Sequence, residues 1–209
     1  MIANIPVLDD LHADATAPST WVQRWSPLVA PGGVVLDVAS GHGRHARWFH
    51  ERNHPLVLVD RSPAAIESIA IPASACEAVV ADIENGPWPF TGRQFDAVVV
   101  THYLWRPLMP VLLDSLAPGG VLIYETFAQG NETVGKPSRP EFLLRPGELL
   151  QICSQLRIVA FEDGFIDGRA DKAPRFVQRI AAVRALDPPV IAGDALSGLA
   201  SIPTRYPLG

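Results

Sequence analysis

Short apolar runs recur along the chain, and segments with helical spacing or turn residues separate them. Most of these runs are rich in Val, Ile and Leu, which is typical of strands buried on both faces of a parallel sheet. The expected strands cover residues 34–38, 56–60, 77–81, 95–102, 121–127, 157–162 and 176–186. Strands alternate with helices up to residue 127, which predicts βαβ units with right-handed crossovers.

Helical patterns fill several of the intervals between these strands. They are expected at about residues 20–26, 43–52, 62–70, 107–116 and 146–155. Ser62 and Pro63 supply an N-cap and a first-turn proline, and the segment that begins at Thr20 matches a capping box. Trp21 and Trp25 share one face of the first helix, which either packs against the sheet or covers a ligand site. Packing is the simpler interpretation.

The sequence therefore predicts an α/β fold with a doubly wound, mostly parallel, seven-stranded Rossmann-like sheet and helices on both faces. No helix separates the last two strands, so we expect an antiparallel strand at one edge. Residues 18–186 form the single predicted domain, after an N-terminal arm at 1–17 and before a Pro-rich tail at 187–209. Residues 128–145 lack a periodic pattern, and a loop of that length is typically functional or mobile.

Composition narrows the class of protein. The chain has 209 residues, of which 48% are hydrophobic, enough for one domain with a full core. Its formal net charge of -5, without a block of Lys or Arg, argues against nucleic acid and anionic membranes as partners. Cys76 and Cys153 have no metal-ligand spacing and are expected to be reduced and buried. The N-terminus is acidic and no run reaches membrane-spanning length, so we expect a cytoplasmic location; the oligomeric state is not indicated.

The strand at 34–38 runs into a glycine turn that opens a helix, and this turn is the main candidate for ligand binding. Gly41 and Gly43 allow a ligand to approach the backbone closely because they have no Cβ atom. The helix that begins near Gly43 points its free N–H groups and the positive end of its dipole at the turn. We therefore expect a cradle for a carboxylate or phosphate group of a cofactor.

Polar residues also mark the carboxyl ends of the other predicted strands. They are Asp60, Asp82, the segment 101–103 and Glu125. Ligands of open α/β sheets bind outside the carboxyl ends of the strands, at the point where the strand order reverses. Because parallel strands end at the same side of the sheet, these side chains and the glycine turn should share one crevice.

Two cofactor classes fit such a crevice. Gly41, Gly43 and Ala46 match the glycine fingerprint of dinucleotide-binding proteins, and Asp60 has roughly the spacing of their ribose-binding acid. An NAD-dependent oxidoreductase is therefore one alternative. That pattern does not require the acid within the first strand, Asp37, or the acid after the third strand, Asp82.

An ordered series of residues resembles the class I S-adenosylmethionine-dependent methyltransferases over about residues 20–186. The series is Asp37-x-Ala39-x-Gly41-x-Gly43, Asp60, Asp82-Ile83 and Pro118-Gly119-Gly120. In size and layout the chain is similar to the small bacterial branch that includes tellurite-resistance-type enzymes. The resemblance implies S-adenosylmethionine as the cofactor and methyl transfer as the reaction. Ala39 stands where the family most often has glycine, so the fit around the cofactor should differ there.

The resemblance also implies roles for individual residues in cofactor binding. Gly41 and Gly43 would lie under the methionine part of the cofactor, and Asp37 would reach its ammonium group. Asp60 would accept hydrogen bonds from both ribose hydroxyls. Asp82 would accept one from the adenine amino group. The remaining residues of the expected cofactor site are Ala39, Ser40, Arg61, Thr101 and, against the adenine ring, Ile83.

The predicted catalytic residues are His102 and Tyr103. Methyl transfer from a sulfonium is an in-line displacement, which requires alignment and no covalent nucleophile. If the acceptor must lose a proton, His102 is the best-placed base; the alternative is a histidine that only ends its strand. Tyr103, with Trp105 and Arg106, either forms a wall of the substrate site or seals the sheet.

Several other polar residues have structural interpretations. Glu125 lies near the end of a central strand, where an unpaired charge is costly, so Arg106 or Arg145 is expected as its partner. Asp96 lies at the start of its strand, away from the crevice, and is expected to have a strand-entry role. The histidines at positions 42, 45, 50 and 54 lack a cysteine or acidic residue at ligand spacing. We expect them to lie on a solvated helix face, and we expect no metal site.

These observations predict a methyltransferase that acts on a small molecule, with the 128–145 loop, the first helix and the tail covering the acceptor. Three alternatives stay open: an NAD-dependent oxidoreductase, a non-catalytic cofactor-binding module and an RNA methyltransferase. The last would need a basic surface that binds RNA in a salt-dependent way. Its scattered candidates are Arg139, Arg145, Arg169, Lys172 and Arg175. The sequence does not identify the acceptor atom.

Overall fold

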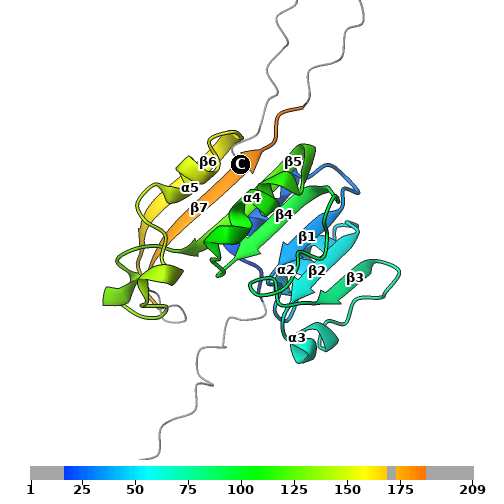
Figure 1. Cartoon of the computed structure of the whole chain (residues 1–209), viewed down its shortest axis with the longest axis horizontal. Coiled ribbons are helices and arrows are strands. Elements are labelled where there is room, and N and C mark those ends of the chain that lie inside the picture. Colours follow the sequence, from blue (N-terminus) through cyan, green and yellow to red (C-terminus); the bar gives the residue numbers. More distant parts are fainter. Residues whose placement is uncertain (1–16, 169–172, 187–209) are drawn as a thin grey trace, which may run out of the picture.

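One seven-stranded sheet, in the order β3-β2-β1-β4-β5-β7-β6, forms the centre of the computed structural model, which describes residues 17–168 and 173–186 (Figure 1). All pairs from β3 to β5 are parallel, and β7 is antiparallel to both of its neighbours. The strands are β1 (Val35–Val38), β2 (Leu56–Asp60), β3 (Cys76–Val80), β4 (Phe95–Thr101), β5 (Leu116–Phe127), β6 (Arg157–Ile166) and β7 (Arg175–Val183). The predicted fold class is confirmed, and the antiparallel strand lies one position in from the edge.

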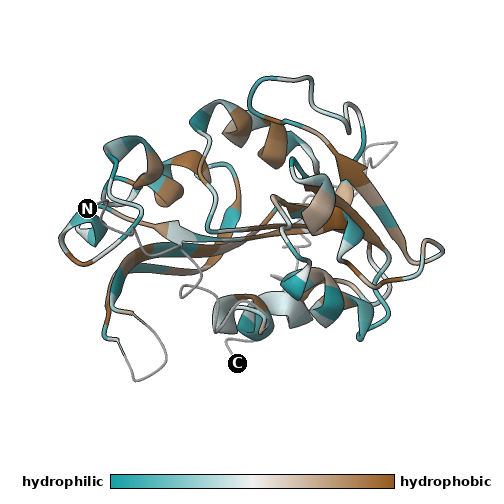
Figure 2. Ribbon diagram, turned by 90° about the horizontal axis from the view of Figure 1, so that it is seen from below, coloured by the Kyte–Doolittle hydropathy of each residue, from teal (hydrophilic) through white to brown (hydrophobic). Residues whose placement is uncertain are grey.

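Helices cover both faces of this sheet, which runs between them when the molecule is seen edge-on (Figure 2). One face carries α1 (Thr20–Trp25), α2 (Arg44–His50) and α3 (Pro63–Glu67), and the other carries α4 (Met109–Asp114) and α5 (Glu148–Ile152). Short 3-10 turns occur at η2 (Ser26–Leu28), η3 (Arg106–Leu108), η4 (Asn131–Thr133) and η5 (Pro140–Phe142). The molecule therefore has three layers.

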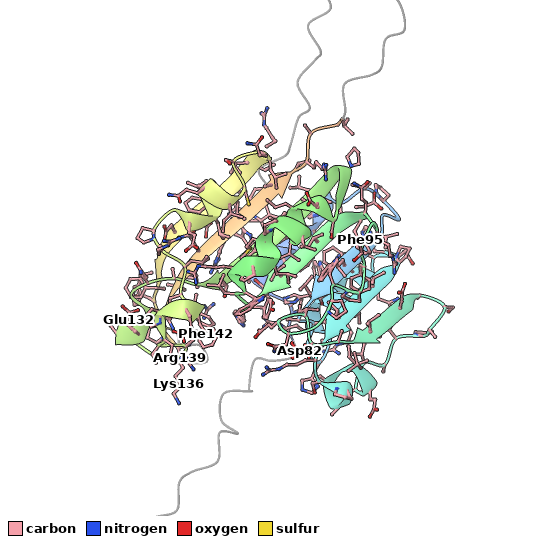
Figure 3. All side chains as sticks on the ribbon, in the orientation of Figure 1. Asp82, Phe95, Glu132, Lys136, Arg139 and Phe142 are labelled. Atoms are coloured by element: carbon pink, nitrogen blue, oxygen red, sulfur yellow. The ribbon has the colours of Figure 1, made fainter. Side chains whose placement is uncertain are left out.

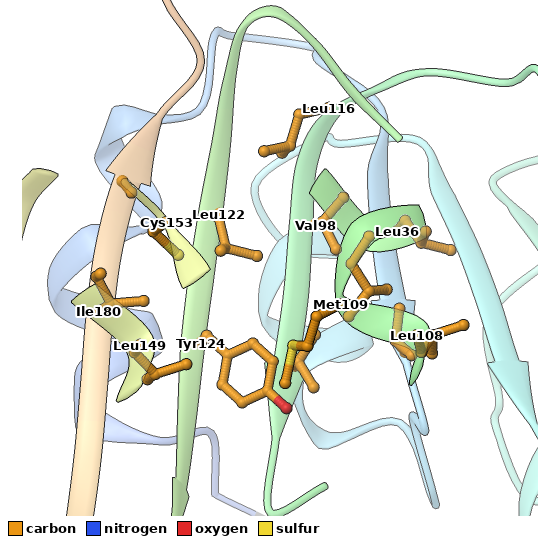
Figure 4. Close-up of a cluster of buried hydrophobic side chains, with 14 of the residues drawn as sticks. Leu36, Val98, Leu108, Met109, Leu116, Leu122, Tyr124, Leu149, Cys153 and Ile180 are labelled. Atoms are coloured by element: carbon orange, nitrogen blue, oxygen red, sulfur yellow. The ribbon is translucent and has the colours of Figure 1, made fainter. Parts of the chain in front are cut away.

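The apolar core divides into two clusters, one on each face of the sheet. Side chains alternate along a strand, so Leu36 and Val38 of β1 join the α4 and α5 cluster while Val35 joins the α1 and α2 cluster. In the first cluster, Leu149 of α5 and Tyr124 of β5 are fully or almost fully buried (Figure 4). By the same alternation the side chain of Asp37, between Leu36 and Val38, belongs to the α1 and α2 side.

The Trp face of α1 packs against the sheet, as the simpler interpretation predicted. Trp21 and Trp25 are each 1% exposed, and their rings meet edge to face with centroids 5.6 Å apart. The indole N–H of Trp21 donates a hydrogen bond to the carbonyl oxygen of Ile180 in β7. The helix is capped by Ser19, whose side chain accepts from the Trp21 N–H, so the expected capping box at Thr20 was wrong by one residue.

Element boundaries differ from the expectations mainly where local hydrogen bonds end a helix early. The helix expected to continue to residue 70 ends at Glu67, and the one expected at 146–155 covers only Glu148–Ile152. Strand β5 starts at Leu116 because this residue pairs with Phe95, before a register shift in β4. Asp96 lies at this end of the sheet and accepts a hydrogen bond from the backbone of Val34, the strand-entry role that was expected.

Residues 128–145 follow β5 without a regular helix or strand, apart from η4, η5 and a bridge between Ala128 and Leu144. The buried Asn131 holds the segment: its amide donates to the carbonyl of Pro137 and its side-chain oxygen accepts from the N–H of Phe176. The loop is thus anchored to β7. Most of the predicted arm and all of the tail lie outside the described residues. Of the helices in the described ranges, none combines the length and the hydropathy that a bilayer crossing requires.

The burial of Trp21 leads to a stability prediction. Trp21→Ala should lower the free energy of unfolding by about 3–5 kcal/mol, because it removes a fully buried indole and leaves a cavity. Guanidinium unfolding followed by circular dichroism measures the change. Trp48→Ala, at a partly exposed tryptophan of α2, is the matched control and should cost clearly less. Equal losses in the two variants would contradict the packing role of α1.

Candidate active site

The carboxyl ends of the parallel strands lie together at one end of the sheet. Val38 of β1 pairs with Val59 of β2 and with Val100 of β4, so the three strands finish level with one another. Figure 3 shows Asp82, just after β3, at the same end of the molecule as the loop that follows β5, and Phe95 at the other end. The predicted convergence of strand-end residues is therefore present in the structure.

The turn after β1 contains left-handed backbone at Ala39, Gly41 and Gly43, with φ of 53°, 53° and 71°. The two glycines serve different purposes. A Cβ atom on Gly41 would meet nothing within 4 Å, so the space above this residue is open. A Cβ on Gly43 would lie 2.9 Å from the side chain of Ile69, so this glycine permits α2 to pack closely against the segment after α3. Gly41 therefore forms the open part of the cradle.

Asp37 contributes a buried acid below this turn. Its carboxylate is on β1, is 2% exposed, and its Oδ2 atom has no hydrogen-bond partner among the described residues. Burial raises the pKa of Asp37 to about 7, while the positive charge of Arg44 opposes that rise. The neighbouring Ser40 hydroxyl is also buried without a partner. Unpaired buried polar atoms beside an open backbone cradle fit a ligand that brings its own hydrogen-bond donors, such as an ammonium group.

Two further acids are held by backbone N–H groups at the ends of β2 and β3. Asp60 accepts a hydrogen bond of 2.8 Å from Gly41 and one of 2.9 Å from Ser62. Each of its oxygens retains a lone pair for a ligand. The exposed Asp82 accepts from the side chain of Asn85, which lowers its pKa, and from the N–H of Glu84.

Strand pairing places these two acids on adjacent strand ends, because the N–H of Ala81 donates to the carbonyl of Asp60. Ile83, expected against an adenine ring, is partly buried beside Asp82, and Arg61 is exposed directly after Asp60. The two acids are thus fixed in orientation on neighbouring strands, as a ribose and an adenine site would require.

His45 connects the crevice to α1 and is not on a solvated face. It is 2% exposed, and burial lowers its pKa to about 3. Its Nε2 accepts a hydrogen bond from the N–H of Ser19, so Nδ1 carries the proton and faces the Thr101 hydroxyl at 3.4 Å. The solvated-face expectation was wrong for His45 and also for the buried His54, whose Nδ1 contacts the carbonyl of Gly33. Packing of α2 on the sheet buries the side of the helix that carries His45.

His102 follows β4 with φ of 53° and stacks on Phe127 at a centroid distance of 5.1 Å. A guanidinium nitrogen of Arg44 lies 3.4 Å from its Nδ1. Guanidinium groups only donate, so Nδ1 is the acceptor and Nε2 carries the proton. Desolvation by the crevice walls, and then the charge of Arg44, lower the pKa of His102 to about 4 although part of the ring is exposed. This geometry favours a neutral hydrogen-bond donor over the predicted general base.

A cavity of about 270 Å³ lies beside His102, between the ends of β4 and β5 and the loop at 128–145. Its lining includes Glu84, His102, Tyr103, Phe127, Pro137 and Phe142. Tyr103 is part of the wall of this cavity, with its hydroxyl buried beside Glu84. Its catalytic role stays a prediction. The sequence did not indicate Glu84 or Phe142, because they belong to loops without a periodic pattern.

The ion pairs around Glu125 differ from the expected ones. Glu125 pairs with Arg179 at 2.8 Å, because the two residues face each other in the antiparallel register of β5 and β7. Arg106 and Arg145, the partners expected from the sequence, instead hold Glu148 of α5 at 2.7 Å and 3.4 Å. The expectation that Glu125 is charge-paired is confirmed, but the predicted partners were wrong.

Comparison with known proteins shows which proteins this chain resembles. Residues 35–120 match the family described as a methyltransferase domain. Over 103 residues the chain is 35% identical to a probable methyltransferase, tdiE, of Emericella nidulans. The aligned residues cover 46% of this chain and 31% of that relative. The chain thus spans about a third of the length of this curated relative.

Solved structures share the fold at low sequence identity. TehB from Haemophilus influenzae superposes with a TM-score of 0.67 at 14% identity, covering 84% of this chain and 65% of the TehB chain. The glycopeptide N-methyltransferase MtfA complexed with S-adenosylmethionine gives a TM-score of 0.56 at 18% identity, covering 86% and 100% of the two chains. These likenesses concern the fold.

The sequence thus matches a methyltransferase domain over residues 35–120, less than half of the chain, and the fold is shared with solved S-adenosylmethionine-dependent methyltransferases. The antiparallel β7 between β5 and β6 separates it from the dinucleotide-binding order 3-2-1-4-5-6. The oxidoreductase alternative therefore has no support from the fold.

The strained backbone at Ala39 predicts a stabilising substitution. Ala39→Gly should raise the free energy of unfolding by up to about 1 kcal/mol, because a left-handed φ is costly for alanine and free for glycine. Gly41→Ala is the matched control. Gly41 has the same φ, so this substitution should lower the free energy of unfolding by about the same amount. Thermal unfolding of both variants measures the effect. A less stable Ala39→Gly protein would contradict the left-handed conformation.

The buried neutral state of His45 predicts a pH dependence of stability. Between pH 6.5 and pH 3 the unfolded chain binds a proton at His45 and the folded chain does not, so stability falls as the pH decreases. From pH 7 to pH 5 this contribution should amount to about 1–2 kcal/mol. Urea unfolding at each pH should show a smaller slope for His45→Gln than for the parent protein. Parallel slopes would show that His45 titrates normally in the folded state.

Proposed function

We propose that this chain binds S-adenosylmethionine over the β1 turn and transfers its methyl group to a small molecule in the pocket beside His102. One observation carries the proposal: the unpaired, buried carboxylate oxygen of Asp37 lies beneath a turn whose Gly41 opens into free space. Such an acid is costly unless a cationic ligand compensates it. The ammonium group of the cofactor supplies that cation.

The acids at the neighbouring strand ends suit the nucleoside part of the same cofactor. Asp60 is an ionisable acceptor held by two backbone N–H groups, and it can accept from the ribose hydroxyls. Asp82, at the next strand end, is the expected acceptor for the adenine amino group, with Ile83 next to it. The cofactor supplies an electrophilic methyl group, and these residues hold and orient it.

The chain's own contribution to the reaction is positioning. Orientation of the acceptor in line with the sulfur–methyl bond can lower the activation barrier by several kcal/mol. In favourable cases alignment lowers a barrier by roughly 7–11 kcal/mol. Aromatic side chains of Phe127 and Phe142 line the pocket beside His102. Its volume of about 270 Å³ supports a small acceptor. Neutral His102 can donate a hydrogen bond from Nε2 to the acceptor molecule. Because the ring is uncharged, it adds no positive charge beside the sulfonium.

An RNA acceptor receives less support from the described surface. Arg139 pairs with Glu141, and Arg145 shares Glu148 with Arg106, so these two candidates already have acidic partners. Arg175 lies at the start of β7. Arg169 and Lys172 lie outside the described residues. We therefore treat RNA methylation as an outcome to be tested and not as a second proposal.

Calorimetric titration tests the proposed function directly. S-adenosylmethionine and S-adenosylhomocysteine should both bind at one site, and Gly41→Ala should weaken both by at least tenfold because its methyl group enters the open cradle. Ala39→Gly is the control that leaves this space open. Absence of binding by either ligand to the parent protein would overturn the proposal.

The raised pKa of Asp37 predicts that cofactor binding depends on pH. Below pH 7 Asp37 is protonated in the free protein, and the cofactor ammonium must displace that proton, so affinity should fall up to tenfold per pH unit. Calorimetry in buffers of different ionisation enthalpy measures the released proton. Asp37→Asn should bind more weakly and lose this pH dependence. Asp114→Asn, at an exposed acid on α4, should keep it. Equal affinity of the parent protein at pH 6 and pH 8 would contradict the prediction.

A further inference from the structure

The walls of the acceptor pocket contain an acid and three aromatic rings. From this combination we infer that the acceptor is a small arylalkyl amine, bound in its ammonium form with the nitrogen toward Glu84. This inference rests on the proposed methyl transfer for its reaction, whereas the binding preference follows from the pocket alone.

Charge is the first argument. Among the described residues that line the cavity, Glu84 is the only acidic or basic one other than the neutral His102. No ion pair with a Lys or Arg of the described ranges compensates its carboxylate. Asp82, two residues before it, adds a second negative charge nearby. Arg44 contacts His102, and the charge of Arg61 acts on Tyr103 and Asp82, but neither arginine is part of the lining. A carboxylate or phosphate acceptor would therefore be repelled, and a cation would be attracted.

The hydrogen-bonding groups agree with this sign. The Tyr103 hydroxyl is buried in the wall beside Glu84, and its oxygen can accept a hydrogen bond from a donor-rich ligand. Burial, and then the charge of Glu84 and its interaction with the hydroxyl, raise the pKa of Tyr103, while the positive charge of Arg61 opposes that rise. An ammonium group with two or three N–H donors can satisfy both Glu84 and Tyr103, whereas an alcohol has a single donor.

Shape supports an aromatic body for the ligand. Rings of Tyr103, Phe127 and Phe142 line the cavity, and aromatic faces attract cations as well as other rings. Phe142 is 39% exposed and comes from η5, in the loop whose end Figure 3 shows on the same side of the molecule as Asp82. A volume of about 270 Å³ equals that of roughly nine water molecules. A ligand of about ten non-hydrogen atoms fits this space.

The chemistry balances with these groups. The bound ammonium first loses one proton to water, which frees the nitrogen lone pair and leaves the Glu84 carboxylate charged. The lone pair forms the nitrogen–carbon bond while the sulfur–carbon bond breaks, and its electron pair returns to sulfur. Positive charge thus moves from sulfur to nitrogen, and S-adenosylhomocysteine leaves uncharged at sulfur. Glu84 favours this step because its negative charge lies on the side where the new positive charge develops.

Three probes of matched size test the inference: 2-phenylethylamine, 2-phenylethanol and phenylacetate. Their dissociation constants are measured by calorimetry with the full-length protein, with and without S-adenosylhomocysteine. The amine should bind at least tenfold more tightly than the alcohol, and phenylacetate should bind most weakly. With S-adenosylmethionine present, only the amine should release S-adenosylhomocysteine.

Glu84→Gln should weaken amine binding about tenfold and leave the alcohol unchanged. Glu51→Gln, at an exposed acid after α2, is the matched control and should change neither. Phenylacetate binding as tightly as the amine, no binding of any probe, or an unchanged preference in Glu84→Gln would each overturn the inference. If neither cofactor form binds while the amine preference persists, the proposed methyl transfer fails and the amine pocket stands.

Discussion

The level, parallel pairing of β2, β1 and β4 is the constraint on which both the core and the site depend. Because side chains alternate along β1, the pairing that turns Leu36 and Val38 into one cluster also turns Asp37 toward α2. A slip of one residue would move Asp37 into an apolar cluster and turn Leu36 toward the site. The same register that buries the apolar residues therefore positions the acid, and the site cannot shift without loss of the core.

A second dependence runs from the sheet to the first helix through Ser19. This residue caps α1, its backbone N–H donates to His45, and its hydroxyl donates to Glu125 at 2.9 Å. Glu125 in turn pairs with Arg179 across β5 and β7. The helix is therefore fixed by polar contacts at its start and by the buried tryptophan rings Trp21 and Trp25 along its length. Its position relative to the strand ends follows from the hydrogen bonds of one serine.

The sequence predicts those parts of this arrangement in which the interacting residues are close together along the chain. The glycine turn and the acids Asp60 and Asp82 are predictable because each follows directly from a recognisable apolar strand. The Glu125–Arg179 pair is not, because it depends on the antiparallel register between two strands distant in sequence. The pocket residue Phe142 comes from a loop without periodicity, and the burial of His45 depends on which side of α2 meets the sheet. Local patterns predict strand ends, and tertiary packing decides the partners.

The protonation states of Asp37 and His102 in the crevice both depend on the charge of Arg44. A buried Asp37 favours its protonated form until a cation arrives, since desolvation penalises the carboxylate. Arg44 offsets part of that penalty, and at the same time it keeps His102 uncharged by occupying Nδ1. A protonated His102 would oppose a sulfonium at the same strand ends, so its low pKa removes a repulsion. Under the proposed function, the crevice would accept positive charge at Asp37 and would not generate it at His102, as binding of a cationic methyl donor requires.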